Sequence, residues 1–350
     1  MTFKGCSSGN KKNRSDGKQP RPPTESEVRA NNESSVKTTE LLTDVSPWIG
    51  CIRSELDEMN RGKTGRPFEY CDTMILWIML LCGYYDLTFR KAAGMAKGIL
   101  KPYAIKAPGR STIQRRAEEY CMRLILGAPP EDSRILARHV SAHVTERVRR
   151  VAVDSTGLNL TQTTLWRKNK WTVGPKYRGW LKLHALTDID TGEILAWILT
   201  EEQFGDSPGM DYLYEMVFSA GHRFSCLYAD AAYDKVERWM RLEKDGVDFK
   251  TRFKTDTRPV DHGSASRGRA TRLWKKHRDD WAEASGFEMR WKIECTFSDL
   301  KRIITEFISA RTTNGMVRQV LSMVSAFNVH KRIRADILGT TGNGVFVAEI

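Results

Sequence analysis

The spacing of hydrophobic and polar residues divides the chain into a polar beginning, a helical segment and a segment in which strands alternate with helices. Residues 1–45 are rich in Ser, Asn, Lys, Pro and Glu and show no hydrophobic period. Such a segment buries too little apolar surface to offset the entropy that ordering costs. We therefore expect a disordered tail over residues 1–45.

Residues 46–146 have the pattern of a helical region. The longest apolar run, from Met74 to Leu81 and on to Tyr85, predicts a buried helix. This run is far shorter than the roughly 20 residues that a membrane span requires.

A short helix, a break containing prolines and a second helix are expected next. Ser111 and Gln114 have the spacing of a capping box, which predicts the start of a helix that carries Arg115 and Arg116. A short helix, a turn and a capped basic helix are compatible with a helix-turn-helix DNA-binding unit. Two helices of an ordinary bundle with solvated arginines fit the same pattern almost equally well.

The remaining pattern predicts a domain over residues 147–337, with a basic loop insertion at 255–285 and a C-terminal tail at 338–350. Five strands are expected, near residues 151–153, 180–187, 193–200, 224–229 and 247–253. Helices are expected near residues 210–221, 235–244, 286–308 and 314–336. This order predicts an α/β fold in which helices flank a mixed five-stranded sheet, the ribonuclease H-like arrangement.

The length of the chain indicates the number of its domains, and its charge indicates the kind of partner that it binds. A chain of 350 residues suits about two domains. Its 56 Lys and Arg residues exceed its 43 acidic residues, which gives a net charge of +13. Residues 252–336 alone hold 18 basic and 10 acidic side chains. An excess of positive charge favours a polyanion as partner, because phosphates neutralised by basic side chains release counterions.

Cysteine usage indicates the compartment. The seven cysteines are scattered and form no Cys-x-x-Cys pair, which argues against a disulfide framework and a cysteine zinc site. The N-terminal lysines are followed by no apolar stretch, so no signal peptide is expected. We expect a reducing, intracellular location.

Two aspartates, Asp154 and Asp230, stand where predicted strands end. Ligands of open α/β sheets bind outside such strand ends, and these two strands are neighbours in the assumed order. Neighbouring carboxylates repel each other unless a cation lies between them, and Mg²⁺ prefers carboxylate, phosphate and water oxygens. Each aspartate alone could equally be a cap or turn residue, but the pair favours a metal site. Acids interpreted as turn, helix-start and surface residues are Asp188, Asp190, Asp234 and Asp299.

A predicted helix supplies a third acid. At about 100° per residue, Phe287, Arg290, Glu294 and Lys301 fall within about 60° on one helix face. An acid is thus flanked by two cations. An amphipathic helix with an Arg290–Glu294 salt bridge is the alternative, and the two aspartates favour a catalytic role.

Asp154, Asp230 and Glu294 resemble the catalytic triad of DDE transposases of the IS4/IS5 insertion-sequence group. The signature of that group is Tyr, two residues, Arg, three residues, Glu, six residues and Lys. The spacing is intact from Phe287 to Lys301, and Phe287 replaces the tyrosine.

Other segments carry the resemblance further. The strand containing His184, the turn before Glu193 and the Gly205-Asp-Ser207 segment are similar to the second and third strands of the group and the loop that follows. Gly65-Arg-Pro67 resembles its N-terminal region more loosely. The resemblance extends over roughly residues 60–335.

The resemblance implies a DNA transposase that cleaves transposon ends and transfers the 3′-OH strand into target DNA. Asp154, Asp230 and Glu294 would then be catalytic and would bind two Mg²⁺ ions, for which Mn²⁺ is a substitute. It also implies double-stranded DNA as partner, a homodimer in the active complex and a cytoplasmic, nucleoid-associated location in a prokaryotic cell.

Basic side chains near these acids are candidates for binding DNA. The segment from Trp166 to Lys182 interleaves tryptophans with cations, which suits phosphate contact and base stacking. Core tryptophans beside a solvated basic loop explain that segment almost equally well. The expected DNA-binding residues are Arg290, Lys301, Lys168, Lys170, Lys176, Arg178, Lys182, Arg115 and Arg116.

Two other functions remain open on the sequence. A nuclease of the same fold would cut DNA without joining a 3′-OH to a target. A DNA-binding protein descended from a transposase would have no active site, and the intact acidic triad argues against it.

Overall fold

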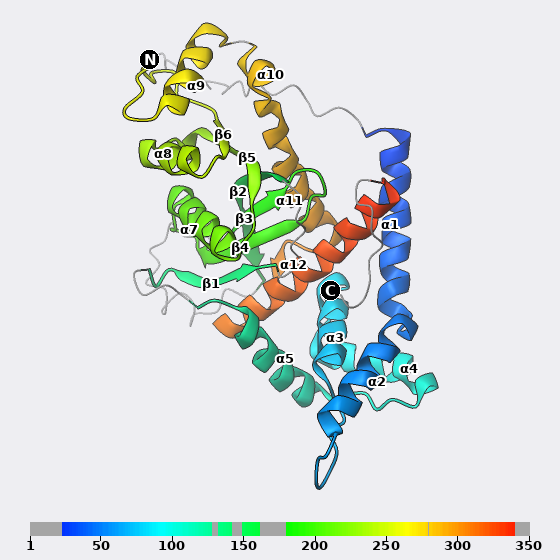
Figure 1. The fold of residues 1–350 in the computed structure, drawn as a ribbon. Coiled ribbons are helices and arrows are strands. Elements are labelled where there is room, and N and C mark those ends of the chain that lie inside the picture. Colours follow the sequence, from blue (N-terminus) through cyan, green and yellow to red (C-terminus); the bar gives the residue numbers. More distant parts are fainter. Residues whose placement is uncertain (1–22, 128–131, 142–148, 162–179, 279, 340–350) are drawn as a thin grey trace, which may run out of the picture.

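The computed structural model describes residues 23–127, 132–141, 149–161, 180–278 and 280–339. A group of helices packs beside a twisted sheet with helices around it (Figure 1). The first group comprises α1 (Glu25–Thr43), α2 (Ser46–Asn60), α3 (Asp72–Tyr84), α4 (Phe89–Leu100), the short 3₁₀ turn η1 (Lys101–Tyr103) and α5 (Arg110–Leu124).

The rest of the chain builds the sheet and the helices against it. Its strands are β1 (Ile135–Val140), β2 (Arg149–Leu160), β3 (Trp180–Asp188), β4 (Ile194–Glu201), β5 (Phe224–Ala229), β6 (Asp248–Thr251) and β7 (Phe307–Ile308). Its α-helices are α7 (Asp206–Ser219), α8 (Val236–Lys244), α9 (Ala265–Lys276), α10 (Trp281–Ser285), α11 (Trp291–Ile303) and α12 (Thr313–Ile337). Two 3₁₀ turns, η2 (Ala231–Tyr233) and η3 (Phe287–Arg290), precede α8 and α11.

The sheet is mixed and has seven strands in the described residues, in the order β1-β4-β3-β2-β5-β6 with β7 on β2. Strand β1 pairs antiparallel with β4, β4 with β3, and β3 with β2. Strand β2 pairs parallel with β5, and β5 with β6. The predicted α/β, ribonuclease H-like arrangement is confirmed. The prediction of five strands was wrong, because β1 and β7 extend the sheet.

Strand β1 lies within residues 46–146, which the sequence assigns to a helical region. Its residues Ile135 and Ala137 are buried in alternation, the period of a strand, and it pairs with β4. The helices of the first region end at Leu124. Strand β7 similarly follows α11, so the helix expected over 286–308 ends at Ile303.

Helix α1 contradicts the expectation of disorder over residues 1–45, at least from Glu25 onward; residues 1–22 lie outside the described segments. Thr24 and Glu27 form a capping box. The buried Ser34 and Thr38 hydroxyls lie 3.3 and 3.2 Å from the ring nitrogens of His330. Burial lowers the pKa of His330 to about 4, which keeps the ring neutral. Because α1 packs through small and hydroxyl side chains, its pattern has no apolar period.

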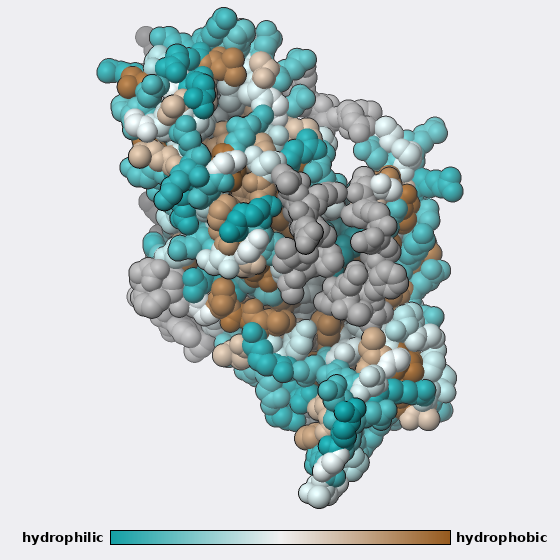
Figure 2. Space-filling view, in the orientation of Figure 1, coloured by the Kyte–Doolittle hydropathy of each residue, from teal (hydrophilic) through white to brown (hydrophobic). Residues whose placement is uncertain are grey.

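Residues 255–285 are more ordered than the predicted basic loop. Within them α9 buries Trp274, whose ring lies 5.2 Å from that of Trp281 in α10. Arg267 turns inward and pairs with Asp234 at 2.8 Å. Hydrophilic side chains predominate on the surface over α8 and α9 (Figure 2).

Helix α12 joins the two parts of the molecule. Its residues contribute to the core beneath the sheet, through Phe327, and to the core of the first helices, through Ala326. Helix α3 crosses it so closely that a Cβ on Gly83 would lie 2.1 Å from the Ser322 carbonyl oxygen. No helix in the described segments has the length and apolar character needed to cross a membrane.

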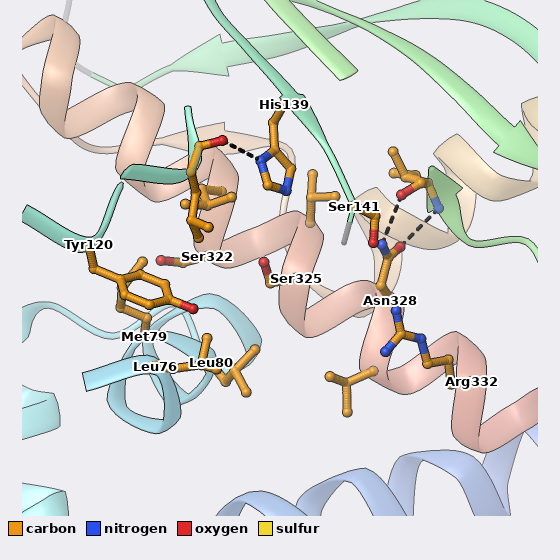
Figure 3. Close-up of a pocket in the computed structure, with 15 residues that line it drawn as sticks. Leu76, Met79, Leu80, Tyr120, His139, Ser141, Ser322, Ser325, Asn328 and Arg332 are labelled. Carbon is orange, nitrogen blue, oxygen red and sulfur yellow. Dashed lines mark hydrogen bonds between the residues drawn. The ribbon is translucent and has the colours of Figure 1, made fainter. Parts of the chain in front are cut away.

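A small cavity of about 100 Å³ lies where α3, α5, β1 and α12 meet (Figure 3). Asn328 in its wall bonds to both the N–H and the carbonyl of Ile194, at 2.9 Å each. His139 Nδ1 lies 3.1 Å from the Leu124 carbonyl oxygen. None of the three predicted catalytic acids lines this cavity.

Replacing Gly83 with alanine is expected to destabilise the fold by about 1–3 kcal/mol, because the added methyl forces α3 away from α12. Urea unfolding of the purified protein measures the change. Gly94→Ala is the matched control, since a Cβ there meets nothing within 4 Å and alanine favours the helix by about 0.5–1 kcal/mol. Equal stability of the two variants would contradict the close packing.

Candidate active site

The pairing of β2 with β5 brings Asp154 and Asp230 together. The two strands run parallel with Ala152 opposite Tyr228. Asp154 lies two residues beyond Ala152 in β2, and Asp230 lies two residues beyond Tyr228, immediately after the end of β5. Residues two apart in a strand project from the same face of a sheet. The expected adjacency of the two strands is confirmed.

The expectation that Asp154 ends its strand was wrong. Strand β2 continues to Leu160, because it stays paired with β3 as far as Asn159. What stops near Asp154 is the pairing with β5. Asp230 does follow the end of β5, and its carboxylate accepts a hydrogen bond from the Ala231 N–H at 2.7 Å.

Arg290 links Asp154 to Glu294. Its Nη1 donates to Asp154 Oδ2 at 3.2 Å, and its Nη2 donates to Glu294 Oε1. The predicted Arg290–Glu294 pair is therefore formed. Sequence reasoning missed that the same guanidinium also reaches the β2 aspartate.

Asp154 has an unfavourable environment for a negative charge. Burial is the largest of the causes that raise its pKa to about 6, and the nearby carboxylates of Asp230 and Asp206 contribute to that rise. The Ser155 N–H, 2.8 Å from Oδ1, and the Arg290 guanidinium oppose this rise. A cation between these acids would remove the penalty.

Asp206, at the start of α7, is a further acid at this site. Its Oδ1 accepts a 2.5 Å hydrogen bond from the Ser155 hydroxyl and lies 2.7 Å from Lys182 Nζ. Hydrogen bonds from these two side chains lower the pKa of Asp206 although burial raises it. One indication of this acid was present in the sequence, because Asp206 belongs to the Gly205-Asp-Ser207 segment, which is similar to a loop of the transposase group.

Buried arginines fix the backbone that follows Asp230. Arg238 donates to the Tyr233 carbonyl at 2.5 Å and to both oxygens of Asp211 at 2.8 and 2.7 Å. The Tyr233 hydroxyl is buried and makes no hydrogen bond with the described residues. Burial raises the pKa of Tyr233, and the carboxylates of Asp154, Asp206 and Asp230 raise it further.

A family model of the transposase DDE domain matches residues 147–329, more than half of the chain. The chain belongs to the DDE transposase family. The match spans β2, β5 and α11, which carry the three acids. Membership in this family implies DNA binding and the use of a divalent metal ion.

The acids of this DDE transposase suit such an ion in chemical type. Carboxylate oxygens are hard donors, and Asp154 lies with two other acids in a partly desolvated site. Within the described segments, no three His, Cys, Asp or Glu side chains already converge on one point as metal ligands. Glu294 is bonded to Arg290 instead, and 57% of its side chain is exposed.

Phe287 does not share a helix face with Glu294. It lies in the 3₁₀ turn η3 after Gly286, which has a φ of +68°, whereas α11 begins at Trp291. Its ring is buried 4.8 Å from that of Trp281. The predicted single stripe from 287 to 301 was therefore wrong for Phe287, because the helix geometry changes at residue 290.

Several predicted DNA-binding side chains already have protein partners. Lys182 pairs with Asp206, Arg115 with Glu119 at 2.7 Å, and Arg116 with Asp72 at 3.0 Å. Lys301 lies half-buried on α11. Four of the predicted residues lie outside the described segments: Lys168, Lys170, Lys176 and Arg178.

The expected helix-turn-helix unit corresponds to α4 and α5. Helix α5 begins at Arg110 after Gly109, and no side chain caps it. The predicted capping role of Ser111 was therefore wrong, since that residue already lies inside the helix.

The raised pKa of Asp154 predicts a pH-dependent stability. The folded protein keeps the proton up to about pH 6, whereas the unfolded chain releases it near the ordinary value of 3.8. Ionised Asp154 therefore penalises folding above pH 6, and the penalty disappears as the pH falls toward 4. Asp154→Asn should be more stable than the parent by about 1–2 kcal/mol at pH 8 without divalent ions.

Urea unfolding in EDTA at pH 8 and pH 4.5 measures this difference. The gain should shrink at pH 4.5, where the parent is protonated. Glu237→Gln, an exposed acid on α8, serves as the control and should change stability little at either pH. A gain of the same size at both pH values would contradict the assignment.

Proposed function

We propose that this chain is a transposase of the IS4/IS5 insertion-sequence group that cuts transposon ends and transfers the freed 3′-OH into target DNA. The observation that best supports this is the bridge from Arg290 to both Asp154 and Glu294, with Asp230 following the strand that pairs with that of Asp154, inside the matched domain. Divalent ions at such a site activate the attacking oxygen and stabilise the leaving 3′ oxygen.

In this proposal, Asp154 and Asp230 would hold the ions, and Glu294 would be the third ligand. Asp154 and Glu294 now pair with the Arg290 guanidinium, and binding to cations would release them from it. Arg290 is then available to hold a phosphate of the DNA backbone by paired hydrogen bonds. Two Mg²⁺ ions, or Mn²⁺ in their place, fit the carboxylate donors.

We also propose that the active complex contains two copies of the chain, one for each transposon end. The first helices and α11 would contact double-stranded DNA, with Lys301 close to the cut. Basic residues outside the described segments, among them Lys168 and Lys170, would add phosphate contacts. A cytoplasmic, nucleoid-associated location follows from this function.

Asp154→Asn, Asp230→Asn and Glu294→Gln should each abolish Mg²⁺-dependent cleavage of an end-containing DNA duplex. DNA affinity should stay within a few-fold of the parent, because each change removes a metal ligand and retains the shape of the side chain. Gel-resolved cleavage and strand-transfer assays, with a parallel binding assay, measure both properties. Glu237→Gln is the matched control and should retain activity.

Each outcome of that experiment separates the proposal from its rivals. Cleavage without strand transfer would identify a nuclease instead. DNA binding by a parent chain that neither cuts nor joins would identify an inactive binding protein. Undiminished cleavage by any of the three variants would show that the substituted acid has no catalytic role.

Lys301→Gln should weaken binding to end DNA uniformly across sequences, because it removes a phosphate contact. The slope of log affinity against log salt concentration should decrease by about 1. Arg302→Gln is the comparison on the same helix, since Arg302 is already paired with Asp299 at 2.7 Å and should change the slope less. Identical slopes for Lys301→Gln and the parent would exclude the contact.

A further inference from the structure

The two carboxylate oxygens of Asp206 have different surroundings. Oδ1 accepts from Ser155 at 2.5 Å, pairs with Lys182 at 2.7 Å and lies 3.6 Å from His184 Nδ1. Oδ2 makes no hydrogen bond with the residues that the structure describes. The side chain is 35% exposed, so Oδ2 can accept a hydrogen bond from a bound molecule.

This carboxylate is anchored next to the proposed metal ligands. Ser155, which donates to Asp206, follows Asp154 directly in β2 and gives its own N–H to the Asp154 carboxylate. The charge of Asp206 also acts on Asp154, whose pKa it raises. Asp206 is therefore held one position along β2 from Asp154, by a side chain of β2 and a side chain of β3.

An independent feature indicates a polar ligand at the same place. The Tyr233 hydroxyl is only 1% exposed and has no hydrogen-bond partner among the described residues, and a buried hydroxyl without a partner is costly. The Tyr233 N–H donates to the Asp230 carbonyl at 3.0 Å, and Arg238 donates to the carbonyls of both Tyr233 and Ser207, so this turn lies between Asp230 and the start of α7. The charges of Asp154, Asp206 and Asp230 raise the pKa of Tyr233. Burial leaves the ring little room to rotate.

The geometry favours an indirect role for Asp206. Ser155 and Lys182 already occupy Oδ1, which leaves a single oxygen of this carboxylate for contact with a bound group. Mg²⁺ retains several of its water molecules in protein sites, and a coordinated water donates hydrogen bonds and needs acceptors. Asp206 Oδ2 and the Tyr233 oxygen are two acceptors without a protein partner in the described segments.

We propose that Asp206 and Tyr233 bind the water shell of the divalent ion held by Asp154 and Asp230. Both are positioning residues, and the proposal rests on the function proposed above. Lys182 holds Oδ1, which leaves Oδ2 as the oxygen that would accept from a metal-bound water. Outer partners of this kind typically change metal affinity by 10- to 100-fold.

The test measures binding of Mn²⁺ alone to the full-length protein by isothermal titration calorimetry, without DNA. Asp206→Asn should weaken Mn²⁺ binding by about 10- to 100-fold. Tyr233→Phe removes one oxygen, keeps the ring and should weaken binding by a smaller factor. Glu215→Gln, an exposed acid on the same helix as Asp206, is the matched control and should bind as the parent does.

A cleavage assay distinguishes positioning from a general loss of structure. For both variants the Mn²⁺ or Mg²⁺ concentration that gives half-maximal cleavage should rise, while the rate at saturating metal stays within a few-fold of the parent. Thermal unfolding followed by circular dichroism shows whether each variant is folded. If Asp206→Asn is unfolded, the Mn²⁺ affinity of Tyr233→Phe still tests the proposal.

The outcomes separate this inference from the proposed function. Mn²⁺ affinity unchanged in both variants, in a parent that binds Mn²⁺ and cuts DNA, overturns the role of Asp206 and Tyr233 and leaves the transposase proposal standing. A parent that neither binds Mn²⁺ nor cuts overturns both. A selective loss of metal affinity in the two variants supports the inference.

Discussion

Repulsion between like charges is the constraint around which the centre of this fold is built. The parallel pairing of β2 with β5 places Asp154 near Asp230, and α7 adds Asp206. Partial burial strengthens the repulsion, because the protein interior screens charge less than water does. The chain counters it with two cations, Arg290 on Asp154 and Lys182 on Asp206. Stability in the absence of metal thus depends on contacts that a bound ion would replace.

Elements with strong local patterns could be predicted from the sequence, and elements held by distant partners could not. Strand β5 has the predicted bounds, and α12 differs from its predicted range by one residue at each end, because the apolar residues of both elements follow the period of the structure that they form. Helix α1 was missed since its stability depends on His330, some 300 positions later, which no local pattern reveals. Strand β1 was missed because its alternation becomes meaningful only beside β4.

The candidate site was predictable as far as chain topology determines it. The order of strands was enough to place Asp154 beside Asp230, and the i,i+4 spacing was enough to pair Arg290 with Glu294. Three details depend on side-chain geometry and escaped prediction: the bridge from Arg290 to Asp154, the 3₁₀ turn that buries Phe287, and the contact of Lys182 with Asp206.

The position of α12 has a consequence for how such a chain can evolve. Helix α12 packs against both the sheet and the first helices. At Gly83 the backbone of α3 lies in contact with the backbone of α12 at Ser322. An N-terminal region attached in this way cannot be exchanged as an independent cassette, because a replacement would have to reproduce the same interlocking surface. On the function proposed above, a change of DNA specificity would arise from point substitutions on the existing helices and not from domain shuffling.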